Sequence, residues 1–217
     1  MLPYDTETLL SAVAGYHSGY SLVTAVVFAL AAITLLLAVW CPTPARRAVP
    51  LLLAACWVWI AAVWHFGIFA QLNFAAPAYG SLFLLQAAFL AWFGYRGLEF
   101  GPPIGWPGVA GFVLAVIALV GLPIVDLLRG WPWLSVRLAG VDPCPTAVLT
   151  LGVLLLSRPP RVGAMIIPAL WTLVAAATGW VLGIASDMLL PAAAALACTA
   201  AVIAGRRAQR PAVRISA

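Results

Sequence analysis

A histidine within a long apolar segment is the first residue of this chain that could do chemistry. His65 stands in the run Trp64, His65, Phe66, about six residues before that segment ends. It would then lie roughly 9 Å below the membrane boundary at 1.5 Å per residue. Polar groups in hydrocarbon are costly and normally face a bundle interior or a watery cavity, so His65 is the leading functional candidate. The alternative is structural: the imidazole bonds a neighbouring helix or reaches the interface.

Further polar and reactive side chains fall on the same predicted side of the membrane. Cys144 lies between two prolines at a helix start, where the helix dipole favours a thiolate. Equally, Pro145 begins that helix with Asp142 as its cap, and Asp187 caps the helix that begins at Met188. The candidate polar site consists of His65, Trp64, Asn73, Gln71, Cys144 and Asp187.

Imidazole and thiolate groups are common ligands of haem and transition metals. His65 could bind such a group together with His17 or Cys144, and these three are the candidate metal ligands. No catalytic residue is identified, and an enzymatic role is not expected. No cofactor is assigned, with haem or a transition metal kept as an alternative.

The composition requires a membrane to hold these side chains. Of the 217 residues, 65% are hydrophobic and 8% are charged. A soluble core of this size cannot bury so much apolar surface, so the lipid bilayer is the expected environment. A spanning helix needs about 20 apolar residues. We predict one all-α transmembrane domain over 1–217 with seven spans, at residues 19–40, 48–71, 78–95, 107–126, 141–157, 163–184 and 188–205.

The fifth span, 141–157, is the weakest of the seven. Only Ala147 to Leu156 is clearly apolar there, and Asp142 stands near the start of the span. A half-buried or re-entrant segment is the alternative for this part of the chain.

Arginines alternate between the gaps and orient the predicted bundle. Nine of them lie in every second gap and in the tail, whereas Arg129 and Arg137 alone lie on the other side. Short basic loops stay cytoplasmic, so we expect the amino terminus outside and the carboxyl terminus inside, with 206–217 as a basic cytoplasmic tail. The scattered arginines form no basic helix or aromatic platform, so nucleic acid is not an expected partner.

Several membrane functions are excluded by residues that the sequence lacks. It has no lysine, so it cannot form a retinal Schiff base. It has no phosphate-binding glycine loop and no zinc-protease motif. No carboxylate falls near a predicted midplane, which argues against a proton pump with a central acid relay.

Four short motifs resemble those of the uncharacterised bacterial membrane proteins grouped as domain of unknown function 6064. They are Trp64-His65, Asn73-x-Ala75-Ala76, Gly140-x-x-Pro143-Cys144-Pro145-Thr146 and Pro168-x-x-Trp171. The resemblance covers nearly the whole chain, although Phe74 stands where a proline is expected. It implies a multi-pass protein of the bacterial cytoplasmic (inner) membrane but no activity. The residues that resemble the family pattern are Trp64, His65, Asn73, Cys144 and Pro145.

Three functions of different classes stay open. A small permease or transport-associated protein would select a solute or ion in an outer vestibule. A redox protein would bind haem or a metal through the ligands named above. A non-catalytic subunit or sensor would hold a membrane protein partner, with its polar residues acting only between helices.

Overall fold

The computed structural model describes residues 3–208, and within that range all regular secondary structure is helical. Six helical segments are long and apolar enough to cross a membrane. They are α2 (Ser21–Trp40), α3 with η1 and η2 (Pro42–Gln71), α4 (Ala76–Arg96), α5 with η3 and α6 (Gly105–Leu128), α8 (Val162–Leu182), and α9 with α10 (Ala185–Arg206). The chain is therefore an all-helical bundle compatible with a multi-pass membrane protein.

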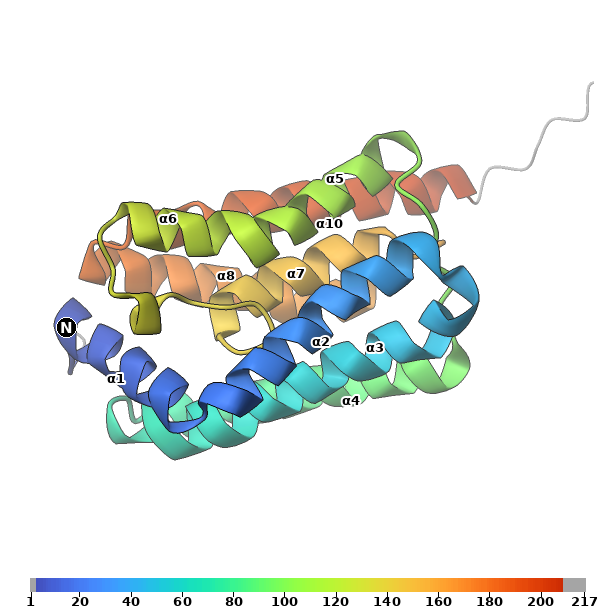
Figure 1. Cartoon of the computed structure of the whole chain (residues 1–217). Helices are drawn as coiled ribbons and strands as arrows, with labels where there is room; N and C mark the ends of the chain where they lie inside the picture. The colour runs from blue at the N-terminus through green and yellow to red at the C-terminus, as the bar shows by residue number, and fades with distance from the viewer. Residues whose placement is uncertain (1–2, 209–217) are drawn as a thin grey trace, which may run out of the picture.

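The predicted fifth span is a shorter helix at the centre of the bundle. Helix α7 covers Pro143–Leu155, and its 13 residues are too few for a full crossing. At 1.5 Å per residue it is about 20 Å long, against a hydrocarbon core of about 30 Å. The chain runs back from α6 along the inside of the bundle before α7 begins (Figure 1). The structure thus supports six full-length spans and one short helix in place of seven full-length spans.

Helix α7 is surrounded by the other helices. Every residue from Pro145 to Leu155 is buried, and α7 contacts α2, α3, α5, α8 and α10. The closest approach is to α5, where a Cβ added at Gly152 would lie 2.6 Å from the carbonyl oxygen of Gly111. Two facing glycines let the backbones approach each other, which is the usual way in which membrane helices pack tightly.

Prolines begin several helices close to the predicted ends. Pro42 follows just after the end of α2 and occupies the first turn of α3, where its missing N–H removes no hydrogen bond. Pro50 and Pro168 lie inside α3 and α8. Two segments are π-helical, η1 (Ile60–Ile68) and η3 (Ile117–Gly121), and η1 carries His65.

An additional helix, α1 (Thr6–Gly19), precedes the first span and was not predicted. Asp5 caps it by accepting a hydrogen bond from the backbone N–H of Thr8 at 2.8 Å. Its buried face comprises Val13, Tyr16 and His17. Helix α1 lies at one end of the bundle, called here the α1 end, and α10 runs toward the opposite end (Figure 1).

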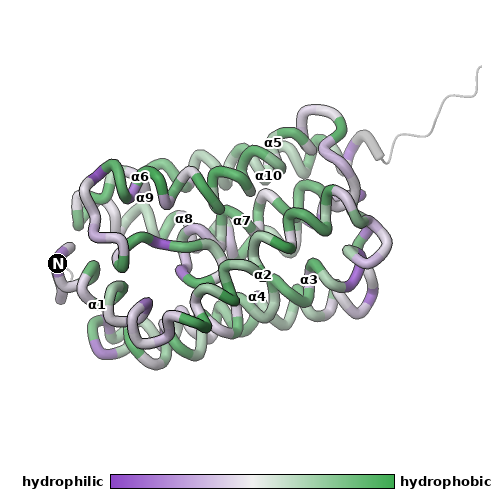
Figure 2. The backbone as a smooth tube through the Cα atoms, in the orientation of Figure 1, coloured by the Kyte–Doolittle hydropathy of each residue, from purple (hydrophilic) through white to green (hydrophobic). Residues whose placement is uncertain are grey.

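The arginine-bearing loops meet at the end opposite α1. The backbone of Leu98 donates to the carbonyl of Arg46, and that of Arg158 donates to Glu99. Hydrophilic residues gather toward both ends, with apolar helices between them (Figure 2). The basic tail expected at 206–217 lies outside the described residues beyond Ala208. Which end faces the cytoplasm stays a prediction.

Candidate functional site

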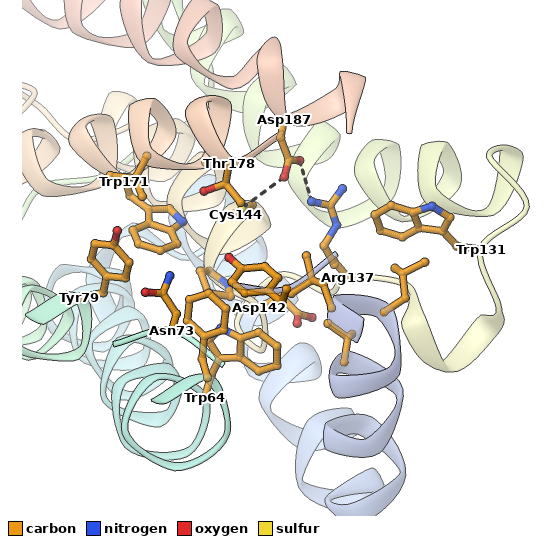
Figure 3. Close-up of a pocket in the computed structure, with 18 residues that line it drawn as sticks. Trp64, Asn73, Tyr79, Trp131, Arg137, Asp142, Cys144, Trp171, Thr178 and Asp187 are labelled. Atoms are coloured by element: carbon orange, nitrogen blue, oxygen red, sulfur yellow. Dashed lines mark hydrogen bonds and ion pairs between the residues drawn. The ribbon is translucent and has the colours of Figure 1, made fainter. Parts of the chain in front are cut away.

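Four of the six predicted site residues line one cavity at the α1 end. Trp64 comes from η1, Asn73 from the loop before α4, Cys144 from α7 and Asp187 from α9. The cavity has a volume of about 80 Å³. Segments far apart in the sequence therefore converge on one space (Figure 3).

Aromatic rings form much of the cavity wall. Trp64 and Phe69 stack with their ring centres 5.5 Å apart, and Tyr4 packs edge-on against Phe69 at 5.5 Å. Burial raises the pKa of the Tyr4 hydroxyl, which stays protonated as a donor. The aromatic lining residues are Tyr4, Trp64, Phe69, Tyr79, Trp131 and Trp171.

The centre of the polar network is Arg137, a residue that the sequence interpretation had treated only as a loop arginine. Its Nε donates to Asp126 Oδ2 at 3.0 Å and its Nη2 to Asp126 Oδ1 at 2.7 Å. Its Nη1 donates to Asp187 Oδ1 at 2.6 Å. Burial lowers the pKa of Arg137, but the carboxylates of Asp187 and Asp126 raise it above its usual value. The guanidinium is therefore charged within the bundle.

One signal in the sequence could have identified Arg137. It is one of two arginines on the side that the charge asymmetry leaves almost free of bases, and all four aspartates fall on that same side. A base that departs from the prevailing charge distribution is a candidate for a buried ion pair.

Asp187 does not cap a helix with its side chain. It lies inside α9 (Ala185–Met188), and its carboxylate binds Arg137 instead. Its second oxygen, Oδ2, lies 4.0 Å from the Cys144 sulfur. The capping interpretation was wrong because the ion pair with Arg137 engages the carboxylate more strongly than a backbone N–H would.

Asp142 occupies the N-cap position of α7, but its side chain bonds elsewhere. Its Oδ2 accepts from the backbone N–H of Leu138 at 2.7 Å and lies 3.1 Å from Nε2 of His17. Burial by itself lowers the pKa of His17. The hydrogen bond to Asp142 and the negative charge of Asp142 together raise this pKa by more than burial lowers it, so the pKa of His17 lies above its usual value. The His17–Asp142 pair ties α1 to the start of α7.

The thiol of Cys144 has surroundings that oppose the expected thiolate. Cys144 is in the first turn of α7, as predicted, yet its sulfur lies 4.0 Å from the carboxylate oxygen Oδ2 of Asp187. Burial of the sulfur disfavours a thiolate, and the neighbouring negative charge of Asp187 disfavours it further. Cys144 is therefore better suited as a weak donor to the cavity than as a nucleophile.

His65 lies behind the cavity wall and does not line the cavity. Its side chain is fully buried, and neither ring nitrogen has a hydrogen-bond partner within residues 3–208. Its ring packs edge-on against Phe83 at 4.5 Å and Trp171 at 5.2 Å, between centroids. Gln71 is also outside the cavity: it is exposed, and its amide donates to the carbonyl of Gly67.

The three candidate metal ligands do not come together. His65 is enclosed by aromatic rings, His17 is bound to Asp142, and only Cys144 lines the cavity. In the described part of the chain, no group of three or more His, Cys, Asp and Glu side chains could hold a metal ion.

Comparisons with known proteins place the chain in a family without assigning an activity. No curated protein and no solved structure matches it. Residues 6–212 match the family of unknown function DUF6064, from the start of α1 to beyond the last described helix. The chain therefore belongs to the DUF6064 family.

Proposed function

We propose that this protein binds a small polar solute or ion in the cavity at the α1 end and acts as a small permease or transport-associated protein of the cytoplasmic membrane. The single observation that carries the proposal is the convergence of Asn73, Arg137, Cys144 and Asp187 on one space of about 80 Å³. Buried polar groups are costly in an apolar bundle, so their gathering around a cavity favours a ligand.

The cavity combines an apolar body with a few polar groups. Such a composition is typical of small-molecule sites, in which aromatic walls supply contact area and polar groups fix the orientation. The ion pairs of Arg137 hold the two sides of the site in place before any ligand arrives. Preorganisation of this kind lowers the ordering cost of binding.

Helix α7 separates the cavity from the opposite end of the bundle. The residues of α7 below Cys144 are buried, and Thr150 accepts a hydrogen bond from Nε1 of Trp57 at 2.9 Å. A solute that passes through must displace these contacts, whereas a solute that only binds need not. Binding and transport are therefore separate measurements.

The test uses Cys144 as a reporter in intact cells. A variant with Cys41→Ser, Cys56→Ser and Cys198→Ser retains only Cys144, and we expect a membrane-impermeant methanethiosulfonate reagent to label it from outside, slowly at neutral pH and faster at alkaline pH, because Asp187 disfavours the reactive thiolate. A matched variant that retains only the exposed Cys41, at the arginine-bearing end, should be labelled only after permeabilisation. A bound solute should slow the labelling of Cys144.

Two results would contradict the proposal. Labelling of Cys144 only after permeabilisation would place the cavity on the cytoplasmic side. Labelling of denatured protein alone, even at alkaline pH where the thiol ionises, would show that the cavity is closed to solutes. Uptake into vesicles, with and without the solute that protects Cys144, then tests permeation itself.

A further inference from the structure

The ligand chemistry of the cavity can be argued one step further, on the basis of the proposed function. We infer that the solute is a small primary ammonium compound that also carries an oxygen acceptor, of the size of ethanolamine. Three features support this inference: the excess of carboxylates, the aromatic walls and an unpaired N–H donor.

Carboxylates outnumber cations around the cavity. Arg137 is the one basic side chain among the described lining residues, and it is already bound by three carboxylate oxygens of Asp126 and Asp187. Asp142 adds a third carboxylate, balanced only in part by His17 when that imidazole is protonated. Arg129 lies nearby but is exposed and bound to the carbonyl of Gly183, so water screens its charge. The site therefore favours a cation over an anion.

One carboxylate oxygen of Asp187 is left for the ligand. Asp187 Oδ1 accepts from Arg137, whereas Oδ2 has only the weak thiol contact of Cys144 at 4.0 Å. Asp187 and Cys144 lie beside each other at the cavity wall (Figure 3). An ammonium group at this position would donate a charge-assisted hydrogen bond to Oδ2.

The aromatic walls add a second attraction for a cation. Trp64, Tyr79 and Trp171 face the same space, on the other side of the cavity from Arg137 (Figure 3). Ring faces within about 6 Å attract cations, and the attraction is larger where water is excluded. Small ammonium ions are the ligands that sites of carboxylates and aromatic rings commonly bind.

An unpaired donor calls for an oxygen acceptor on the same ligand. Trp171 is 9% exposed, and its Nε1 has no nitrogen or oxygen partner in the described structure; the nearby sulfur of Cys144 is only a weak acceptor. The indole nitrogen is on the side of the ring that faces Cys144 (Figure 3). Buried indole N–H groups normally find a partner. A hydroxyl oxygen on the ligand would satisfy this donor while the ammonium binds Asp187.

The volume limits the size of the ligand. A cavity of about 80 Å³ is roughly half as large as the 150 Å³ cavity that accommodates benzene. The space therefore suits a molecule of about four non-hydrogen atoms, as in ethanolamine.

Calorimetric titration of the full chain in phosphatidylcholine nanodiscs tests the inference with three probes of equal size. Ethanolamine carries both groups, propylamine lacks the oxygen, and ethylene glycol lacks the amine. We expect ethanolamine to bind at least tenfold more tightly than ethylene glycol and about three- to tenfold more tightly than propylamine, as one neutral hydrogen bond implies. Equal binding of ethanolamine and ethylene glycol would overturn the inference.

A matched pair of variants on α8 assigns the acceptor contact. Trp171→Phe keeps the aromatic wall and removes only the N–H, so it should lower ethanolamine affinity to that of propylamine and leave propylamine binding unchanged. Trp180→Phe is the control, because Trp180 is 77% exposed and does not line the cavity. An equal loss for both amines in Trp171→Phe would contradict the assigned contact.

A second pair separates ligand binding from the anchoring of Arg137. Asp187→Asn should abolish the preference for ethanolamine over ethylene glycol. Asp126→Asn also weakens the Arg137 ion pair, but Asp126 does not line the cavity, so the preference should remain. Loss of the preference in both variants, or in neither, would overturn the role of Asp187.

The lipid composition of the nanodiscs distinguishes two sources of the ammonium compound. Ethanolamine chemistry occurs in free amino alcohols and in lipid headgroups. If nanodiscs that contain phosphatidylethanolamine suppress the binding of free ethanolamine, the headgroup is the natural occupant; if they do not, it is a free solute. Protection of Cys144 by another small solute, with no binding of the two amines, would overturn this inference and leave the proposed function intact.

Discussion

Nη1 of Arg137 lies 2.6 Å from Oδ1 of Asp187, and this contact joins the segment leading into α7 to helix α9. The same guanidinium bonds both oxygens of Asp126 on α6. Three segments that are separate in the sequence are thus held by one side chain.

Removal of Arg137 should destabilise the protein strongly. Arg137→Leu leaves Asp126 and Asp187 buried without their cation, and breaking a buried pair typically costs about 3–5 kcal/mol. Thermal and denaturant unfolding in detergent measures the loss. Arg129→Leu is the control, since Arg129 is exposed, and it should change stability by less than about 1 kcal/mol. Similar losses in both variants would show that the buried network does not stabilise the fold.

The close contact between α5 and α7 should not tolerate a side chain. A Cβ at Gly152 would lie 2.6 Å from both the Gly111 carbonyl oxygen and the Ala115 backbone nitrogen, so the helices must separate. Overpacking of this kind costs about 1–3 kcal/mol, and Gly152→Ala should lower the melting temperature accordingly. Gly163→Ala adds the same methyl group where nothing lies within 4 Å, and it should be neutral or stabilising. A neutral Gly152→Ala would contradict the packing.

The His17–Asp142 pair should make stability depend on pH. Because Asp142 raises the pKa of His17 in the folded state, protonation stabilises the fold. This contribution is fully present below the unfolded pKa of about 6.5 and is lost as the pH rises through the raised folded pKa. The difference in unfolding free energy between wild type and His17→Gln should therefore be larger at pH 5.5 than at pH 9.

The control for this prediction is Ser18→Ala, a change at the neighbouring exposed residue. It should shift stability equally at both pH values. A His17→Gln effect that grows with rising pH would contradict the sign of the coupling.

Orientation is predicted from the arginine-bearing loops. A reporter enzyme that works only in the cytoplasm should be active when it is fused after Ala217, because positively charged loops stay inside. A second reporter inserted at exposed Gly130, in the loop after α6, should give the opposite result. If both reporters lie on one side, or if the carboxyl-terminal reporter lies outside, the predicted topology is wrong.

The sequence alone determined the helical class and most of the helix positions. Long apolar runs can satisfy their backbone groups in a bilayer only as helices, so α2, α4 and α8 lie within a few residues of the predicted spans. Helix α1 was missed although Asp5 supplies a start signal, because its residues lack the long apolar run used to find spans. The length of α7 was uncertain for a related reason. A segment that is buried inside protein can be a shorter helix, with more irregular backbone at its ends, than a segment that faces lipid.

Only the tertiary structure decided which polar residues share a site. Trp64, Asn73, Cys144 and Asp187 were expected together from topology, and the structure brings them to one cavity. His65 faces aromatic rings instead, since the rotation of η1 about its axis depends on packing that no local pattern encodes. Arg137 reaches Asp126 and Asp187 across 11 and 50 residues of sequence. Long-range ion pairs depend on how helices pack in three dimensions, whereas hydropathy depends on each segment by itself.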